Sequence, residues 1–274
     1  MVVRTSSIDA LPSALADGGE LERRLGDRPP AVFLDYDGTL TPIVERPEDA
    51  VISESMRETV RRLAQRCTVC VVSGRDRAVV QDLMGVYDLV VAGSHGFDIW
   101  SPQQGTIEHS AASGFEDLLA RITAQLQDEL SSVDGSAVEP KRASVAAHYR
   151  RASEAGRQRV REVVEDVLAR HPDELKVTPG KMVYEIQPKL DWDKGKAVLH
   201  LLDVLDLESD AVPIYIGDDV TDEHAFEALA DRGIGIIVAG ADDPEAKGRD
   251  TAAQFRLESV DEVQRFLDSL AQSR

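Results

Sequence analysis

The sequence predicts an α/β protein with a mostly parallel central sheet, into which a smaller α/β domain is inserted. Three observations support this prediction. Short apolar runs alternate with helical segments, three of these runs end in a polar residue, and the middle of the chain has a different pattern from its ends. The chain has 274 residues, long enough for one large core or for a core and a smaller domain.

The alternation of apolar runs with helical segments indicates βαβ units, in which a helix connects two parallel strands. The expected strands are the apolar runs at 31–34, 68–72, 89–92, 212–216 and 234–238. The expected helices are at about 54–66, 76–84, 195–206, 222–231 and 260–270. The last of them opens with a capping-box pattern from Ser259 to Glu262.

The smaller domain is expected at 110–187. Its predicted elements are helices near 114–130 and 153–170, a strand near 143–150, and strands near 174–178 and 182–187 joined by a turn at Pro179-Gly180. The core then consists of residues 30–109 and 188–274, and residues 1–29 form an N-terminal arm or helix.

Composition excludes several classes of partner. The formal net charge of −19 argues against nucleic acid and favours a monomer, and no segment approaches the roughly 18 apolar residues of a membrane span.

Cys67 and Cys70 point to opposite faces of one strand, so they cannot form a disulfide with each other, and we expect a reducing, cytoplasmic setting. The segment 141–151 carries four positive charges and no acid, which makes it a candidate for binding an anion.

The most informative motif is Asp35-Tyr-Asp37-Gly38-Thr39, which follows the apolar run at 31–34. Its carboxylates fall at the carboxyl end of a buried strand, where open α/β sheets bind ligands. Gly38 lets the backbone bend there and approach an anion closely. An Asx turn after a strand is the alternative, but it explains Asp37 and Gly38 without explaining Asp35.

A second acidic motif, Gly217-Asp218-Asp219 followed by Asp222, also ends an apolar strand. The aspartates of the two motifs would repel one another strongly unless a cation lay between them. A hard divalent ion with oxygen ligands resolves this, and Mg²⁺ is usual where phosphate is bound. The alternative is an acidic helix N-terminus with Thr221 as its cap, which leaves Asp218 and Asp219 unexplained.

Two further groups are candidates for phosphate contacts. Ser73-Gly74-Arg75 ends the second strand with a hydroxyl and free amides near a helix start. Lys194 opens a helix after the inserted domain and could neutralise charge on a phosphoryl group. The alternative for Ser73-Gly74-Arg75 is a simple turn at the end of a strand. The alternative for Lys194 is a lysine exposed to solvent.

The order of these motifs resembles the haloacid dehalogenase superfamily over about residues 31–109 and 188–265. The resemblance implies a Rossmann-like hydrolase core with an inserted cap domain. It implies that Asp35 is the nucleophile, Asp37 the general acid/base, and Ser73 and Lys194 the groups that stabilise phosphate charge. It also implies Mg²⁺ held by the Asp35 carboxylate, the Asp37 backbone carbonyl and Asp218, with Asp219 and Asp222 as ligands or just outside them.

Within that superfamily, three segments are similar to trehalose-6-phosphate phosphatases: Gly93-Ser94-His95-Gly96, His148-Tyr149-Arg150, and 180–188. The sequence has Phe97-Asp98 where the resemblance leads us to expect a glutamate, which leaves the roles of His95 and Asp98 open. The positions that the resemblance implies for substrate binding are Gly74, Arg75, His95, Arg142, His148, Arg150, Lys181 and Glu185.

The expected function is therefore Mg²⁺-dependent hydrolysis of trehalose 6-phosphate through an aspartyl phosphate. A phosphatase of another sugar phosphate, such as sucrose phosphate or a glucosyl or mannosyl phosphoglycerate, is the first alternative. A phosphomutase and a non-catalytic phosphosugar-binding module are the others.

Overall fold

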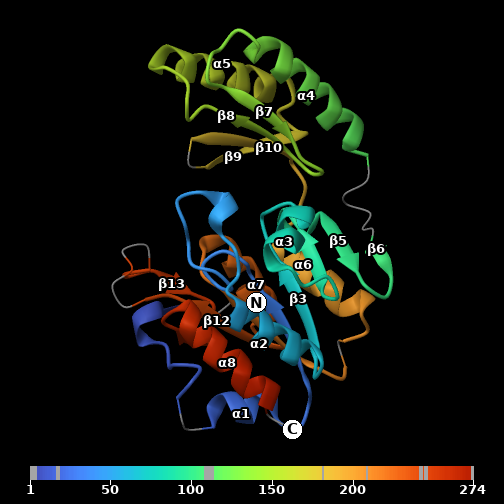
Figure 1. Ribbon diagram of the computed structural model, residues 1–274, viewed down its shortest axis with the longest axis vertical. Coiled ribbons are helices and arrows are strands. Elements are labelled where there is room, and N and C mark those ends of the chain that lie inside the picture. Colours follow the sequence, from blue (N-terminus) through green and yellow to red (C-terminus); the bar gives the residue numbers. More distant parts are fainter. Residues whose placement is uncertain are drawn as a thin grey trace. The chain divides into compact units, whose positions relative to one another are not determined.

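The computed structural model describes residues 5–16, 19–107, 114–180, 182–207, 209–240, 243 and 246–272. The chain folds into two compact units, shown in Figure 1. The larger unit comprises Met1–Ile107 and Asp193–Arg274, and the smaller comprises Glu108–Trp192. The predicted α/β class with a mostly parallel sheet is confirmed.

The larger unit is built on an eight-stranded sheet in the order β14-β12-β11-β2-β3-β4-β5-β6. The first six of these strands are parallel, and β5 and β6 add to one edge antiparallel. The strands are β2 (Pro30–Leu34), β3 (Thr68–Val72), β4 (Val90–Gly93), β5 (Asp98–Ser101), β6 (Gly105–Ile107), β11 (Val212–Gly217), β12 (Ile234–Val238) and β14 (Phe255–Leu257).

Helices cover both faces of this sheet. The helices α2 (Glu54–Ala64), α3 (Arg77–Met84) and α8 (Val260–Gln272) pack on the face that carries Leu34 and Ile216. Side chains alternate along a strand, so Tyr215 points to the opposite face, where it contacts Phe226 of α7 (Glu223–Leu229). Helix α6 (Lys194–Val204) packs against α7.

The cap of α8 differs in detail from the predicted capping box. The Glu262 amide donates to the Ser259 hydroxyl at 3.3 Å, as the pattern requires. The Glu262 carboxylate, however, accepts from the amide of Glu258 at 2.8 Å rather than from that of Ser259. The helix begins where the sequence predicts, because the orphan amides are still satisfied.

The N-terminal residues that the structure describes contain only short elements. They are β1 (Ser6–Ser7), which pairs with β13 (Asp250–Thr251), the 3₁₀ turn Ile8–Ala10 and α1 (Glu20–Leu25). The sequence analysis did not predict β1, β5, β6, β13 or β14, nor β7 (Ala137–Pro140) of the smaller unit. These strands have two to four residues, too few to show a hydrophobic period.

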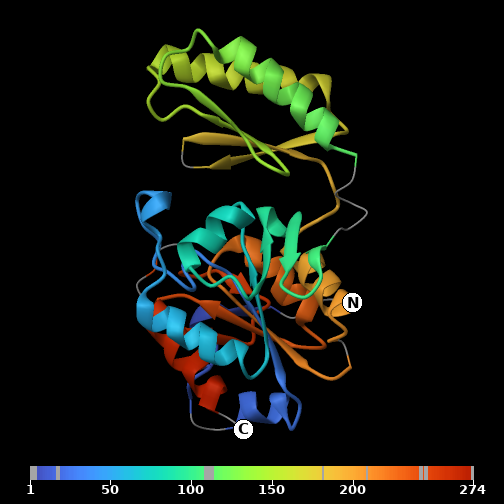
Figure 2. The same cartoon turned by 45° about the vertical axis from the view of Figure 1, so that its right-hand side comes forward.

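The smaller unit is a four-stranded antiparallel sheet in the order β7-β8-β10-β9. Helices α4 (Glu116–Leu130) and α5 (Glu154–Arg170) cover one face of this sheet (Figure 2). The core between them is apolar and includes Ile122, Val163 and Ile186. The strands are β7 (Ala137–Pro140), β8 (Val145–His148), β9 (Leu175–Gly180) and β10 (Val183–Pro188).

The predicted turn at Pro179-Gly180 is wrong. Both residues belong to β9, where Pro179 pairs with Tyr184 and Gly180 pairs with Val183. Proline lacks the amide that a central strand would need, but β9 lies at the edge of the sheet and tolerates it. Across the described ranges, no helix has both the length and the apolar character that crossing a membrane would require.

Candidate active site

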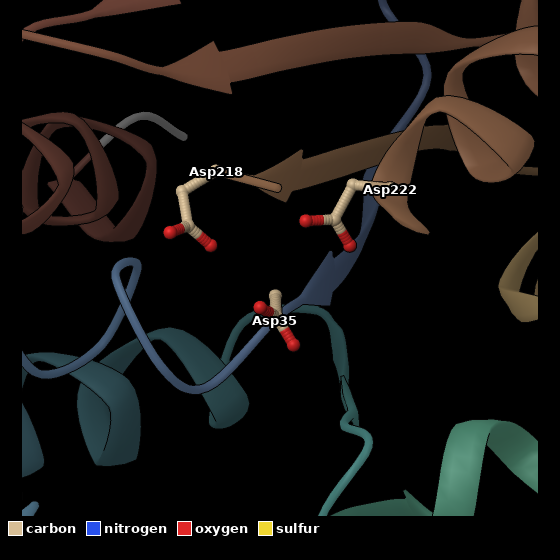
Figure 3. Close-up of side chains that lie close together, drawn as sticks. All are labelled: Asp35, Asp218 and Asp222. Atoms are coloured by element: carbon tan, nitrogen blue, oxygen red, sulfur yellow. The ribbon is translucent and has the colours of Figure 1, made fainter. Parts of the chain in front are cut away.

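Three neighbouring parallel strands, β11, β2 and β3, are followed directly by Asp218, Asp35 and Ser73 respectively. Because parallel strands share one carboxyl edge, these polar residues follow one another along that edge, as the sequence predicts. Figure 3 shows the carboxylates of Asp35, Asp218 and Asp222 gathered there. One oxygen from each of the three lies within 4.8 Å of the others.

Lys194 is the cation of this cluster. Its Nζ lies 3.0 Å from Asp35 Oδ1 and 2.7 Å from Asp222 Oδ1. Asp193 caps α6 by accepting from the Lys196 amide at 2.9 Å, which places Lys194 at the first helical position. Asp35, Lys194 and Asp222 are 5%, 3% and 0% exposed, so their charges interact with little screening by water.

Burial and mutual repulsion alter the acidities of these groups. Burial raises the pKa of Asp35 to about 7; Lys194 opposes this shift and Asp222 adds to it. Burial, followed by the charges of Asp35 and Asp222, raises the pKa of Asp218 to about 8. Burial alone would lower the pKa of Lys194, but the charges of Asp35 and Asp222 outweigh it and keep the amine protonated. The single positive charge of Lys194 therefore does not neutralise the negative charges that the three clustered aspartates carry when they are ionised.

The cluster fits a divalent cation. Its donors are all carboxylate oxygens, which suit Mg²⁺. Gly38 has φ +76°, and a Cβ at this position would collide with the carboxylate of Asp218, so the loop can approach Asp218 only with glycine here. Asp35 and Asp218 are the carboxylates that would hold the ion.

The oxygens of Asp222 are largely occupied within the protein. Its Oδ1 accepts from Lys194 and, at 2.6 Å, from the Tyr215 hydroxyl, and its Oδ2 accepts from the Asp219 amide at 2.9 Å. Tyr215 was missed by the sequence analysis. The signal available was a single hydroxyl-bearing residue in the otherwise apolar strand that leads to Asp218.

Asp219 lies outside the carboxylate cluster. It is exposed and caps the 3₁₀ turn Val220–Asp222, accepting from the Val220 amide at 2.6 Å. The helix-start alternative for this motif proposed Thr221 as the cap, and the structure assigns that role to Asp219 instead. The acidic motif therefore combines both interpretations, since Asp218 lies in the cluster and Asp219 caps the turn.

Asp37 is paired with Arg75 rather than with the cluster. The guanidinium donates from Nε to Asp37 Oδ2 at 2.6 Å and from Nη2 to Oδ1 at 2.7 Å. Its Nη1 donates to the Pro47 carbonyl at 2.7 Å. The structure therefore brings the predicted acid/base and a predicted substrate-binding residue into one ion pair.

The loop after β4 is bound to the loop after β3. The His95 amide donates to the Ser73 carbonyl at 2.8 Å, and the Ser94 amide donates to the Arg75 carbonyl at 2.7 Å. A Cβ on Gly74 would lie 2.7 Å from His95 Cε1, so the His95 ring lies against the glycine. Ser94 and His95 have φ +50° and +56°, a strained pair of the kind that clusters at functional sites.

Asp98 lies in β5, where its carboxylate is 3.1 Å from Nε of Arg77. This ion pair joins β5 to α3 within the larger unit. Asp98, which lies where the family resemblance led us to expect a glutamate, therefore forms an ion pair with Arg77 that links two elements of the larger unit.

In the smaller unit, Glu185 and His148 lie on the sheet face that is turned away from α4 and α5. Glu185 Oε1 accepts from the Ser144 hydroxyl at 2.7 Å and lies 3.3 Å from Lys141 Nζ. His148 Nε2 lies 2.8 Å from Glu139 Oε2. Arg142 and Arg150 are exposed beside this sheet, and Lys181 falls outside the described residues.

The larger unit, with acidic residues and a lysine at the carboxyl edge of its sheet, has the fold of the haloacid dehalogenase-like class. The chain resembles a solved haloacid dehalogenase-like hydrolase from Bacteroides thetaiotaomicron with a TM-score of 0.62 and 18% identity, covering 89% of this chain and 100% of that one. The sequence model of trehalose-phosphatases matches residues 33–261. The chain is 42% identical over 274 residues to a trehalose-phosphate phosphatase of Mycobacterium tuberculosis, covering 98% of this chain and 68% of that protein. The chain therefore belongs to the trehalose-phosphatase family.

The chain is also similar to a solved structure and to a much longer relative. The chain resembles the solved trehalose-6-phosphate phosphatase of Aspergillus fumigatus, with a TM-score of 0.65, 27% identity, and coverage of 97% of this chain and 100% of that one. It is also 42% identical over 275 residues to an uncharacterized glycosyl hydrolase of Mycobacterium tuberculosis. That match covers 97% of this chain but only 20% of the length of the relative.

Proposed function

We propose that this protein hydrolyses trehalose 6-phosphate to trehalose and phosphate. The observation that carries the proposal is the contact of Lys194 with Asp35, beside Asp218, at the carboxyl edge of the sheet. Membership of the trehalose-phosphatase family and the name of the relative that is 42% identical support the choice of substrate. Another sugar phosphate is the alternative substrate.

In the proposed first step, a carboxylate oxygen of Asp35 attacks the phosphorus in line. The new oxygen–phosphorus bond forms as the bond to the sugar oxygen breaks. Asp37 protonates the departing sugar oxygen, which is otherwise a poor leaving group, and general acid catalysis typically contributes about 10²–10⁴-fold. Lys194 and the Ser73 hydroxyl stabilise the negative charge on the phosphoryl oxygens.

In the second step, Asp37 takes a proton from a water molecule, which attacks the phosphorus of the aspartyl phosphate. The Asp35 carboxylate leaves, and free phosphate is released. Arg75 orients Asp37 through both of its oxygens, and each of these oxygens keeps a second lone pair on which a proton can be exchanged.

Mg²⁺ is the proposed cofactor, with Asp35, Asp218 and the Asp37 backbone carbonyl as its ligands and Asp219 and Asp222 outside the inner set. When bound, the ion offsets the negative charges of the substrate phosphate and of the carboxylates.

The sugar is proposed to contact the polar face of the smaller unit through Arg142, His148, Arg150, Lys181 and Glu185. Glu185 supports this best, because Ser144 and Lys141 fix its carboxylate as an acceptor for sugar hydroxyls. His95, Gly74 and Arg75 are the proposed contacts in the larger unit. We also propose a cytoplasmic monomer, consistent with the charge of −19 and the free cysteines.

The test is phosphate release from trehalose 6-phosphate, glucose 6-phosphate and sucrose 6-phosphate, each with Mg²⁺ or EDTA. We expect Mg²⁺-dependent release from trehalose 6-phosphate alone, and none from an Asp35→Asn variant. Release from one of the other two esters would refute trehalose 6-phosphate as the substrate but would still support the proposed phosphatase reaction. No release from any of the three would favour a mutase or a binding module.

A further inference from the structure

Tyr215 is the one hydroxyl-bearing residue of β11, which runs from Val212 to Gly217. It is 0% exposed. A buried phenol needs a hydrogen-bond partner, since leaving it unpaired costs free energy. Its partner is Asp222 Oδ1, at 2.6 Å, on the side of the sheet that faces α7.

Lys194 lies between two carboxylates and is drawn by both. Its Nζ is 2.7 Å from Asp222 Oδ1 and 3.0 Å from Asp35 Oδ1. The Tyr215 hydroxyl donates to the same Asp222 oxygen that accepts from Lys194. The Tyr215 hydroxyl therefore occupies one lone pair of Asp222 Oδ1. This hydrogen bond weakens the attraction of Asp222 Oδ1 for the Lys194 ammonium group.

We propose that Tyr215 is a positioning residue, which acts through Asp222 to keep the Lys194 ammonium against Asp35, where phosphoryl charge develops. This inference rests on the proposed function, because it assigns a role within the same reaction. Without the phenol, Asp222 would draw Lys194 toward itself and away from Asp35. The transition state would then lose part of the charge stabilisation that Lys194 supplies.

Tyr215→Phe separates this role from packing. The ring of Tyr215 contacts Phe226 edge to face, with centroids 5.7 Å apart, and phenylalanine keeps that contact. Thr59→Val is the matched control, since it removes a buried hydroxyl that donates to the Ser55 carbonyl within α2, away from the carboxylate cluster.

The experiment measures kcat and KM per folded protein, together with Tm, for both variants and the wild type. The substrates are trehalose 6-phosphate and p-nitrophenyl phosphate, with Mg²⁺ present. For Tyr215→Phe we expect kcat to fall about tenfold on both esters, with KM within about twofold of wild type. Thr59→Val should lower Tm without a fall in kcat. A lower Tm with kcat within about twofold of wild type would overturn the role of Tyr215.

A double-mutant cycle tests the route through Asp222. In an Asp222→Asn background, Tyr215→Phe should lower kcat by less than about twofold, because the charged acceptor is already gone. A full tenfold further loss would show that Tyr215 acts independently of Asp222 and would overturn the inference.

The two proposals fail in different ways. Wild-type activity on p-nitrophenyl phosphate without activity on trehalose 6-phosphate would refute the proposed substrate, and Tyr215 would still be tested on the aryl ester. A wild-type protein inactive on both esters would overturn both proposals.

Discussion

Arg75 engages both carboxylate oxygens of Asp37, with N–O distances of 2.6 and 2.7 Å. The two residues are 38 positions apart and meet because β2 and β3 are adjacent and parallel. A bidentate guanidinium–carboxylate pair fixes orientation as well as charge. Arg75 therefore determines the resting position of the proposed acid/base.

Replacing Arg75 by lysine should impair the reaction most where the leaving group is poor, because lysine cannot make the two-point contact that orients Asp37. We expect kcat/KM to fall about tenfold for a sugar phosphate and to change by less than about twofold for p-nitrophenyl phosphate, which needs little acid assistance. Equal losses on both esters would contradict this role. Arg46→Lys, in an exposed pair with Asp49, is the control.

Asp218→Asn should make the cation-free protein more stable at pH 8. The raised pKa values of Asp35 and Asp218 mean that folding favours their protonated forms, so this contribution is present near pH 4 and is lost as pH rises to about 8. In EDTA we expect Tm of the variant to exceed that of wild type by about 5 °C at pH 8. The difference should vanish near pH 4.

The same variant tests the cation site. Mg²⁺ should raise Tm of the wild type at pH 8, since it would bind the folded state and offset the clustered charges. Asp218→Asn should reduce this rise by more than half. An equal rise in both proteins would place the cation elsewhere.

Gly38→Ala should abolish activity. Alanine at φ +76° is strained, and its Cβ would displace the carboxylate of Asp218. We expect kcat to fall more than about 100-fold, as positioning errors near reacting groups can. Gly105→Ala is the matched control, because Gly105 has φ +73° with open space around its Cβ position. Similar losses in the two variants would indicate backbone strain alone.

Glu185→Ala should raise KM for trehalose 6-phosphate about tenfold, because an anchored acceptor for sugar hydroxyls is lost. KM for p-nitrophenyl phosphate should stay within about twofold, since that ester has no sugar. Glu162→Ala, an exposed change on α5, is the control. Equal changes on both esters would remove the reason to assign Glu185 to sugar recognition.

Sequence reasoning was least reliable for short elements and turns. The strands β5 and β6 have four and three residues, and neither is long enough to show a pattern. Pro179-Gly180 has the composition of a turn, yet pairing with β10 extends β9 through both residues. Local composition cannot report such pairing, because it depends on a partner strand.

The sequence by itself determined the α/β class, the five main parallel strands and the edge of the sheet at which Asp35, Ser73 and Asp218 lie. Apolar runs that end in polar residues suffice for this, because parallel strands share their carboxyl edge. Only the tertiary structure decided the partners of each charge. Arg75 holds Asp37, and Tyr215 and Lys194 share Asp222. Lys194 and Asp222 are 28 positions apart, and their contact depends on how α6 and α7 pack, which no local pattern encodes.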